Sequence, residues 1–279
     1  MKFDMVVAGV GGQGILSISF VVDNAALAQG FRFKQSEVHG MAQRGGAVMS
    51  HLRISDSEIF SDLVPHGGAD LILSMEPLEA LRYRRYLSPQ GWLITSSNPF
   101  VNIPNYPEED KILEQVQSID RHVVVNSAEL ARAAGSHHAQ NMVMLGAAGH
   151  LLPLEAKYVE QFIGVLFRAK GDKVIDANLT AFRFGSFAGS FYRDLLGAGL
   201  GNAYAVAVAT HLLPWDYSQE DVQGWIELCR ADGSRELRGW LNTRQWLING
   251  DAAMRSRLAG IDLNNTSKED LEALITETS

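Results

Sequence analysis

A glycine-rich segment near the N-terminus is the first place in this sequence where residue type and spacing could do chemistry. Gly9, Gly11 and Gly14 fit the pattern G-x-G-x-x-G, between a β-branched run at 3–8 and helical spacing of apolar residues at 15–28. Glycines allow a tight turn and a close backbone approach, and the start of the helix presents free N–H groups to a phosphate. The segment predicts either close helix–strand packing or a phosphate-binding loop.

A nicotinamide or flavin dinucleotide is the ligand that this motif first suggests, but the sequence departs from the expected pattern. In a dinucleotide-binding domain, an acidic residue about twenty positions on holds the ribose diol. Here the second strand is expected at 31–33, and the first carboxylate, Glu37, arrives late. No recognisable substrate domain follows. A stand-alone NAD- or FAD-dependent oxidoreductase is therefore the weaker alternative.

A second unusual segment, residues 35–46 (QSEVHGMAQRGG), is polar, contains glycines and lies between two expected strands. Arg44 stands directly before a pair of glycines, which places a permanent cation beside exposed backbone donors, as in anion-binding sites. Glu37 and His39 have side chains suited to proton transfer. The alternative is a buried polar loop that satisfies its own hydrogen bonds and contacts a partner.

The elements that must position these segments alternate between strands and helices. Further strands are expected at 48–54, 70–74, 92–95 and 122–125, and further helices at 77–86, 127–134 and 141–150. This alternation, expected to continue to about Phe187, predicts an α/β fold: a Rossmann-like open sheet with helices on both faces. Residues 1–187 are expected to form that domain.

The last third of the chain has a different pattern. No strand is expected after residue 187, helical spacing occurs at 222–229 and 237–248, and four of the five tryptophans fall here. Thr266 and Glu269 have the spacing of a capping box. We expect residues 188–279 to be a helical extension that serves as a core or subunit contact, since tryptophan is enriched in both settings.

Composition limits the possible function classes. The net charge of −8 disfavours nonspecific binding to nucleic acid or to an anionic membrane. The single cysteine, Cys229, excludes an internal disulfide, a thiolate-held iron–sulfur cluster and a cysteine-rich zinc site within this chain. Neither a signal peptide nor a membrane-spanning stretch is recognised, so the expected location is the cytoplasm.

Three smaller groups of residues have ordinary interpretations. Arg82, Arg84 and Arg85 are expected to pair on a helix surface with nearby glutamates. The adjacent pair His137 and His138 lacks an evident third ligand for a metal. The segment at 96–99 (SSNP) is expected to be a turn after a strand, although such loops can line a nucleotide cleft.

The glycine loop, the 35–46 segment and the strand residues at 50–53 (SHLR) together resemble the gamma domain of 2-oxoacid:ferredoxin oxidoreductases. Within that family they resemble most the small (beta) subunit of the indolepyruvate enzymes. Supporting pieces follow in order at 68–70, 76–83, 141–146 and 178–185. The resemblance covers about 1–187, and its ordered series of motifs is far more specific than the glycine loop alone.

The resemblance implies a reaction in which a 2-oxoacid is decarboxylated on thiamine diphosphate, oxidised through iron–sulfur clusters and released as acyl-CoA. This chain has neither a Gly-Asp-Gly segment nor a cysteine cluster. Thiamine diphosphate, Mg²⁺ and the iron–sulfur clusters are therefore expected on a large partner subunit in a hetero-oligomer, which would pass electrons to ferredoxin or another acceptor. The expected substrate is indolepyruvate or another arylpyruvate, and the alternative is a non-catalytic assembly subunit.

The resemblance also implies candidate binding residues. No catalytic residue and no metal ligand is expected in this chain. In related single-chain enzymes the gamma domain helps to hold coenzyme A. The matching positions here are Gly11, Gly12, Gln13, Gly14, Gln43, Arg44, Gly45, Gly46 and Asn141. Gln43 departs from the family's paired lysines, so that only Arg44 keeps the cation.

Overall fold

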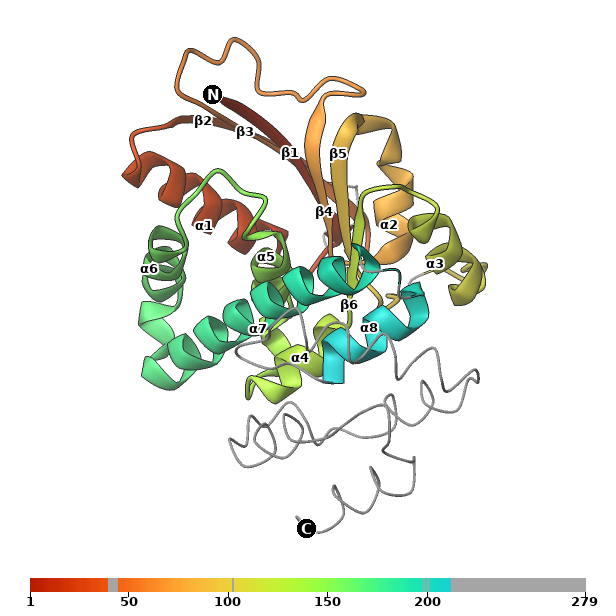
Figure 1. The fold of residues 1–279 in the computed structure, drawn as a ribbon. Helices are drawn as coiled ribbons and strands as arrows, with labels where there is room; N and C mark the ends of the chain where they lie inside the picture. The colour runs from red at the N-terminus through yellow and green to blue at the C-terminus, as the bar shows by residue number, and fades with distance from the viewer. Residues whose placement is uncertain (40–44, 102, 198, 200, 212–279) are drawn as a thin grey trace. The chain divides into compact units, whose positions relative to one another are not determined.

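The computed structural model describes residues 1–39, 45–101, 103–197, 199 and 201–211 (Figure 1). Contacts divide the chain into two units, Met1–Ser190 and Phe191–Ser279. The first unit contains the sheet and every site residue that the structure describes. Of the second unit, the described part is the end of one helix and the helix that follows it. The predicted helices at 222–229 and 237–248, the capping box and Cys229 lie outside the described residues.

The first unit is built on one mixed sheet of six strands. Their bounds are β1 (Lys2–Val10), β2 (Arg32–His39), β3 (Ala47–Ser55), β4 (Ala69–Ser74), β5 (Leu87–Ser96) and β6 (His122–Val125). The spatial order is β2-β3-β1-β4-β5-β6. β1, β4, β5 and β6 run parallel, whereas β3 is antiparallel to both of its neighbours. The parallel strands are buried apolar runs, as expected for strands covered on both faces.

The helices cover both faces of this sheet (Figure 1). α1 (Ile15–Ala28) and α5 (Gln140–Ala148) lie on one face, while α2 (Pro77–Arg82) and α3 (Glu109–Gln117) lie on the other. The remaining helices are α4 (Ser127–Ala133), α6 (Ala156–Phe167), α7 (Asp172–Gly197) and α8 (Asn202–His211), with short 3-10 turns at Arg84–Tyr86, His137–Ala139 and Arg168–Lys170. The predicted α/β class is therefore confirmed.

The strand and helix predictions agree closely with the structure where turn residues mark the ends. α1 and β6 have the predicted bounds. The helix predicted at 77–86 ends at Arg82 and continues as a 3-10 turn. The prediction that strands and helices alternate up to Phe187 was wrong: among the described residues the last strand ends at Val125, and α7 runs through position 187. After β6, helices α4 to α7 follow one another along the chain with no described strand between them.

Helices α5 and α7 approach each other at backbone distance. A Cβ atom placed on Gly146 would stand 1.9 Å from the carbonyl oxygen of Phe182, and one placed on Gly185 would stand 1.9 Å from that of Val143. A Cβ atom placed on Gly189 would stand 2.7 Å from the carbonyl oxygen of Ala147. Glycine is the residue that permits such an approach, because it carries no side chain. These glycines explain why the family-like segments at 141–146 and 178–185 occur together.

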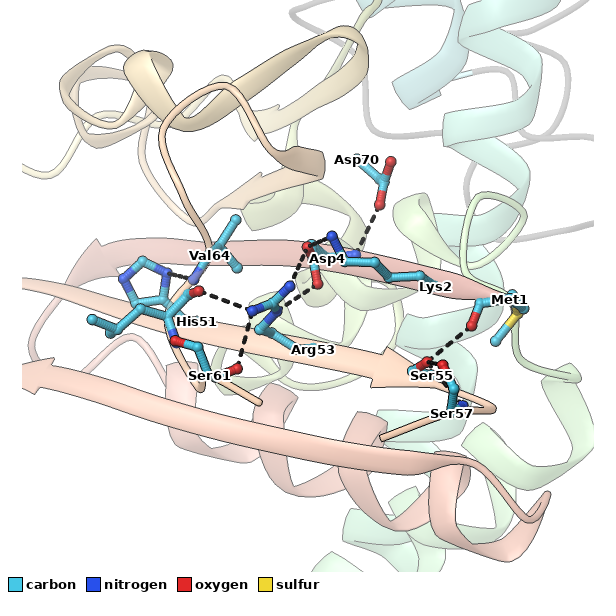
Figure 2. A network of polar contacts seen from close by, with 11 residues as sticks. Met1, Lys2, Asp4, His51, Arg53, Ser55, Ser57, Ser61, Val64 and Asp70 are labelled. Atoms are coloured by element: carbon cyan, nitrogen blue, oxygen red, sulfur yellow. Dashed lines mark hydrogen bonds and ion pairs between the residues drawn. The ribbon is translucent and has the colours of Figure 1, made fainter. Parts of the chain in front are cut away.

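A buried ion pair fastens the amino end of β1 to β3 (Figure 2). Asp4 is fully buried and accepts two hydrogen bonds from Arg53, at 2.8 and 3.1 Å. Arg53 also donates to the carbonyl oxygens of Ser61 and Leu63, which holds the segment after β3 against the sheet. Lys2 pairs with Asp4 at 2.8 Å. This network lies at the opposite end of β1 from the glycine loop.

No helix among the described residues is long and apolar enough to cross a bilayer.

Candidate functional site

The carboxyl ends of the four parallel strands meet along one edge of the sheet, where ligands of open α/β sheets bind. The glycine loop follows β1, and Glu76 stands two residues after β4. The segment at 97–98 follows β5, and Asn126 follows β6. We refer to this row of loops, together with the starts of α1 and α5, as the carboxyl edge. It gathers most of the polar groups that the sequence singled out.

The glycine loop and the glycine pair before β3 are joined by their backbones. The N–H of Gly11 donates to the carbonyl oxygen of Gly46 at 2.8 Å, and the N–H of Gly45 donates to that of Gly11 at 3.4 Å. This contact follows from the register of β1 and β3, which pairs Val10 with Ala47. The two predicted anion-binding segments are therefore one structural feature.

The glycines of this feature have two different roles. A side chain on Gly9 would meet Gln13, Met75 and Ile15 at 2.8–3.1 Å, so this position serves close packing. Gly12 and Gly45 have φ values of +103° and +77°, and a Cβ atom on either would meet nothing within 4 Å. Their backbones are accessible, and only glycine adopts such φ values without strain. These two positions can therefore be approached closely by a ligand.

Gln13 has a structural contact of its own. Its side-chain oxygen accepts a hydrogen bond from the N–H of Val10 at 2.7 Å, while its own N–H donates to the Val10 carbonyl oxygen at 3.1 Å. The side chain thus closes the turn, and only its amide NH₂ group is left to contact a ligand. α1 then begins after Gly14, with no acidic residue in its first turn, which keeps the positive end of the helix dipole uncompensated.

Asn141 connects the start of α5 to this loop. Its side-chain Nδ2 donates to the carbonyl oxygen of Gly14 at 3.4 Å, and the residue is buried. A side chain on Gly14 would stand 2.5 Å from the same nitrogen, and its φ is +80°. Both the space and the backbone conformation therefore require glycine there. The sequence prediction that Asn141 lies at a helix start is confirmed.

A polar cluster continues the carboxyl edge beyond Asn141. The Ser96 and Ser127 hydroxyls lie 2.8 Å apart, and Ser127 donates to Gln140 at 3.1 Å. Asn98 accepts from the backbone of Ala128 at 2.9 Å. The segment at 96–99 is therefore a turn, as predicted, and the side chains of Ser96 and Asn98 hold the start of α4 to the end of β5. Its polarity is structural.

Glu76 is a buried carboxylate at the carboxyl edge that sequence analysis did not recognise as special. It caps α2 by accepting from the N–H of Glu79 at 2.8 Å, and it also accepts a hydrogen bond from the Tyr106 hydroxyl. Burial, and next the hydrogen bond to Glu76, raise the pKa of Tyr106. The signal in the sequence was Glu76 before Pro77, because proline favours the first helical position after a capping residue.

The other predicted candidates are accounted for as follows. Arg82 forms the expected i,i+3 ion pair with Glu79 at 3.0 Å. Among the described residues no cluster of three or more metal-ligating side chains occurs, and His137 and His138 contact each other. The backbones of Glu37 and His39 pair with β3. Gln43 and Arg44 lie outside the described residues. The structure brings together the other predicted positions: Gly11, Gly12, Gln13, Gly14, Gly45, Gly46 and Asn141.

The position of β3 separates this fold from the dinucleotide-binding arrangement. In that arrangement the strand after the first helix lies beside β1 and carries the ribose-binding acid. Here β3 occupies the place beside β1, in the antiparallel direction, and β2 lies one strand further out. Glu37 pairs with Ser50 in this outer hairpin. The geometry therefore favours a phosphate or packing role for the glycine loop over a dinucleotide site.

Comparison with known proteins bears out the resemblance seen in the sequence. The chain is 36% identical over 194 residues to the indolepyruvate oxidoreductase subunit IorB of Archaeoglobus fulgidus, covering 66% of this chain and 94% of the relative. It is 39% identical over 194 residues to the subunit of the same name from Methanothermobacter thermautotrophicus, covering 66% and 96%.

Solved structures show the same fold at lower identity. The pyruvate oxidoreductase subunit PORC of Thermotoga maritima aligns with a TM-score of 0.52 at 22% identity, over 66% of this chain and 94% of that one. The 2-oxoglutarate:ferredoxin oxidoreductase of Magnetococcus marinus aligns with a TM-score of 0.56 at 20% identity, over 68% and 31%. The family model for pyruvate ferredoxin/flavodoxin oxidoreductase matches residues 4–187. The chain therefore belongs to the pyruvate ferredoxin/flavodoxin oxidoreductase family, and the matched residues include the whole carboxyl edge.

Proposed function

We propose that this chain is the small subunit of a 2-oxoacid:ferredoxin-type oxidoreductase that converts an arylpyruvate such as indolepyruvate, with coenzyme A, to acyl-CoA and CO₂. The observation that carries the proposal is the backbone hydrogen bond between Gly11 and Gly46, which joins the two glycine segments at the carboxyl edge, beside Asn141. Relatives named as indolepyruvate oxidoreductase subunits match almost their whole length to this chain, which supports the substrate class.

Coenzyme A is the ligand that we propose for the carboxyl edge. The M. marinus enzyme that shares this fold was solved with 2-oxoglutarate, coenzyme A and succinyl-CoA bound. In this chain the open backbones of Gly12 and Gly45 and the uncompensated start of α1 are suited to phosphate groups. Arg44, the neighbour of Gly45, would add a permanent positive charge. The proposed role is to hold and orient coenzyme A, not to carry out bond-making steps.

Thiamine diphosphate, Mg²⁺ and the iron–sulfur clusters are proposed to lie on a large partner subunit. With one cysteine in the whole sequence, this chain cannot hold a four-thiolate cluster by itself. When bound on the partner, thiamine diphosphate supplies the carbanion stabilisation that decarboxylation of a 2-oxoacid needs. The complex is proposed to be cytoplasmic and to pass electrons to ferredoxin or another acceptor. Within it, this chain is proposed to contact the large subunit partly through residues 188–279.

The experiment is purification of the chain at native levels, followed by an assay of the complex with indolepyruvate, coenzyme A and an artificial electron acceptor. We expect a large thiamine- and iron–sulfur-containing subunit to co-purify and the activity to require both chains. A lone monomer without a cofactor-bearing partner would contradict the proposal. Saturable micromolar binding of NAD or FAD by the purified chain would instead favour the dinucleotide alternative.

Arg44→Ala separates coenzyme A binding from a purely scaffolding role. In the assembled complex we expect this change to raise the apparent KM for coenzyme A at least about tenfold, because a charge-assisted contact to phosphate contributes about 1.5–3 kcal/mol. The KM for the oxoacid should remain unchanged. Equal KM values for coenzyme A in the variant and the unaltered complex would support a non-catalytic assembly subunit.

A further inference from the structure

A shallow groove lies on the outer side of α1, between this helix, β2 and α6. Its volume is about 500 Å³, and it is lined chiefly by Leu16, Phe20 and Asp23 of α1, Phe33 and Gln35 of β2, and Leu166 of α6. α1 and α6 lie side by side in the first unit (Figure 1). Leu16 belongs to the first turn of α1, so the groove begins close to the carboxyl edge.

Exposed apolar side chains run along α1 in the groove and beyond it. In the groove lining, Leu16 is 56% exposed and Phe20 37%. Leu27, about one helical turn past Asp23 and outside that lining, is 53% exposed. With Asp23 they follow the spacing i, i+4, i+7, i+11, which places all of them on one face of α1. Single exposed leucines are ordinary, but a contiguous apolar stripe beside a concave surface marks an interaction site.

Asp23 sits within this stripe as a buried and incompletely satisfied carboxyl group. It is 4% exposed, and its Oδ1 atom has no hydrogen-bond partner among the described residues. Burial raises its pKa to about 7. Among the described residues, no other titratable side chain lines the groove. Burying a carboxylate without a cation or donors is unfavourable, so this residue weakens the isolated chain unless something else pairs with it.

We propose that the groove is the docking site for a segment of the cofactor-bearing partner subunit, an apolar stretch carrying one lysine or arginine that pairs with Asp23. The identity of the partner rests on the proposed function. The apolar stripe would bury the segment, and the carboxylate would fix its register. A partner docked there would lie next to the start of α1, beside the groups proposed to hold coenzyme A.

A second copy of this chain does not fit the groove. A two-fold contact would bring the same lining from both copies together, because an isologous interface uses one surface twice. The described residues of the lining include no lysine or arginine, so two Asp23 carboxylates would share a buried interface without a cation. Charge complementarity therefore favours an occupant that brings a cation, which the same groove of a second copy cannot supply.

The test measures assembly and lone-chain stability on the same variants. Asp23→Asn keeps the shape of the side chain and removes its charge. At pH 8 we expect it to raise the melting temperature of the isolated chain but to increase the Kd for the purified partner at least about tenfold, because it leaves the partner's cation unpaired. Phe20→Ser should also weaken assembly. Phe60→Ser removes an aromatic ring that is 88% exposed away from the groove and should leave the Kd unchanged.

A photo-crosslinking amino acid in place of Phe20, in the intact complex, identifies the occupant. Crosslinking to an apolar partner peptide that contains lysine or arginine supports the proposal. Crosslinking to residues 212–279 of the same chain, to a second copy, or an unchanged Kd for Asp23→Asn would overturn it. The unaltered complex is assayed in parallel with an arylpyruvate and coenzyme A. If the complex docks through the groove but is inactive, only the proposed function is contradicted. If the complex is active but Asp23→Asn binds the partner with an unchanged Kd, only the docking site is contradicted.

Discussion

Gly185 of α7 lies against Val143 of α5 so closely that a Cβ atom on it would stand 1.9 Å from the Val143 carbonyl oxygen. Gly146 has the reciprocal relationship with Phe182. Because α5 begins beside Asn141, this crossing fixes the position from which the Asn141 side chain reaches the glycine loop. The site at the carboxyl edge therefore depends on helix packing that lies behind it.

Gly185→Ala is expected to be strongly destabilising. The added methyl group would overlap backbone, which cannot move aside as a flexible side chain can, so we expect a loss of about 2–3 kcal/mol or more in the free energy of unfolding. Gly164→Ala is the matched control, because Gly164 also lies within a helix but has nothing within 4 Å of its added Cβ. That change should stabilise the chain by up to about 1 kcal/mol. Chemical denaturation of both variants checks this, and equal effects would refute the close crossing.

Asn141→Ala tests whether the tether to Gly14 matters for the proposed ligand. Loss of this hydrogen bond should lower the free energy of unfolding by about 1 kcal/mol and raise the KM for coenzyme A in the complex. Asn178→Ala is the control, since Asn178 is also buried and donates to a backbone carbonyl oxygen, that of Val174 at 2.8 Å. It should lose similar stability with no change in KM. Equal KM values for the two variants would show that Asn141 is only structural.

The parts of the fold that could be predicted are those whose ends carry local signals. α1 begins after Gly14 in the left-handed conformation, and α4 begins after Asn126, whose side chain caps it. Strand order could not be predicted, because nothing within β3 tells whether it pairs with β1 or lies beyond β2. α7 was missed because Gly185 and Gly189 count against a helix on propensity, whereas packing against α5 requires them.

Some residues of the candidate site could likewise be predicted from the sequence, and others could not. The glycine loop, Gly45 and Gly46 were each predicted as candidate coenzyme A-binding positions from the family resemblance, but the backbone hydrogen bonds between them were not predicted. Asp23 was not anticipated. A single aspartate within an apolar helical pattern belongs to no motif, and its burial depends on β2 and α6, which the helix's own pattern does not specify. Glu76 was missed for the same reason, since its partner Tyr106 is distant in the sequence.

Arg53→Ala should destabilise the chain much more than removal of a surface arginine. Asp4 is fully buried, and the Arg53 side chain is 12% exposed, so the change leaves a buried carboxylate with Lys2 as its remaining ion-pair partner. The expected loss is about 3 kcal/mol, at the lower end for a broken buried pair. Arg132→Ala removes an exposed pair with Glu129 and should change stability by less than about 1 kcal/mol. Urea denaturation of the two variants side by side measures the difference, and similar midpoints would contradict the structural role of the Asp4–Arg53 pair.

The stability of the isolated chain should depend on pH through Asp23. Its pKa rises from 3.8 to about 7 on folding, so between these values the folded state holds a proton that the unfolded state has lost. The stability that the chain has with Asp23 protonated is therefore fully present below about pH 4, falls as the pH rises towards 7, and is lost above pH 7. A shift of this size corresponds to at most about 4 kcal/mol. Urea denaturation at pH 5.5 and at pH 8 should show lower stability at pH 8, and Asp23→Asn should remove that part of the difference. An identical pH dependence in the variant would mean that Asp23 is ionised in the isolated chain, and its carboxylate would then already have a partner within it.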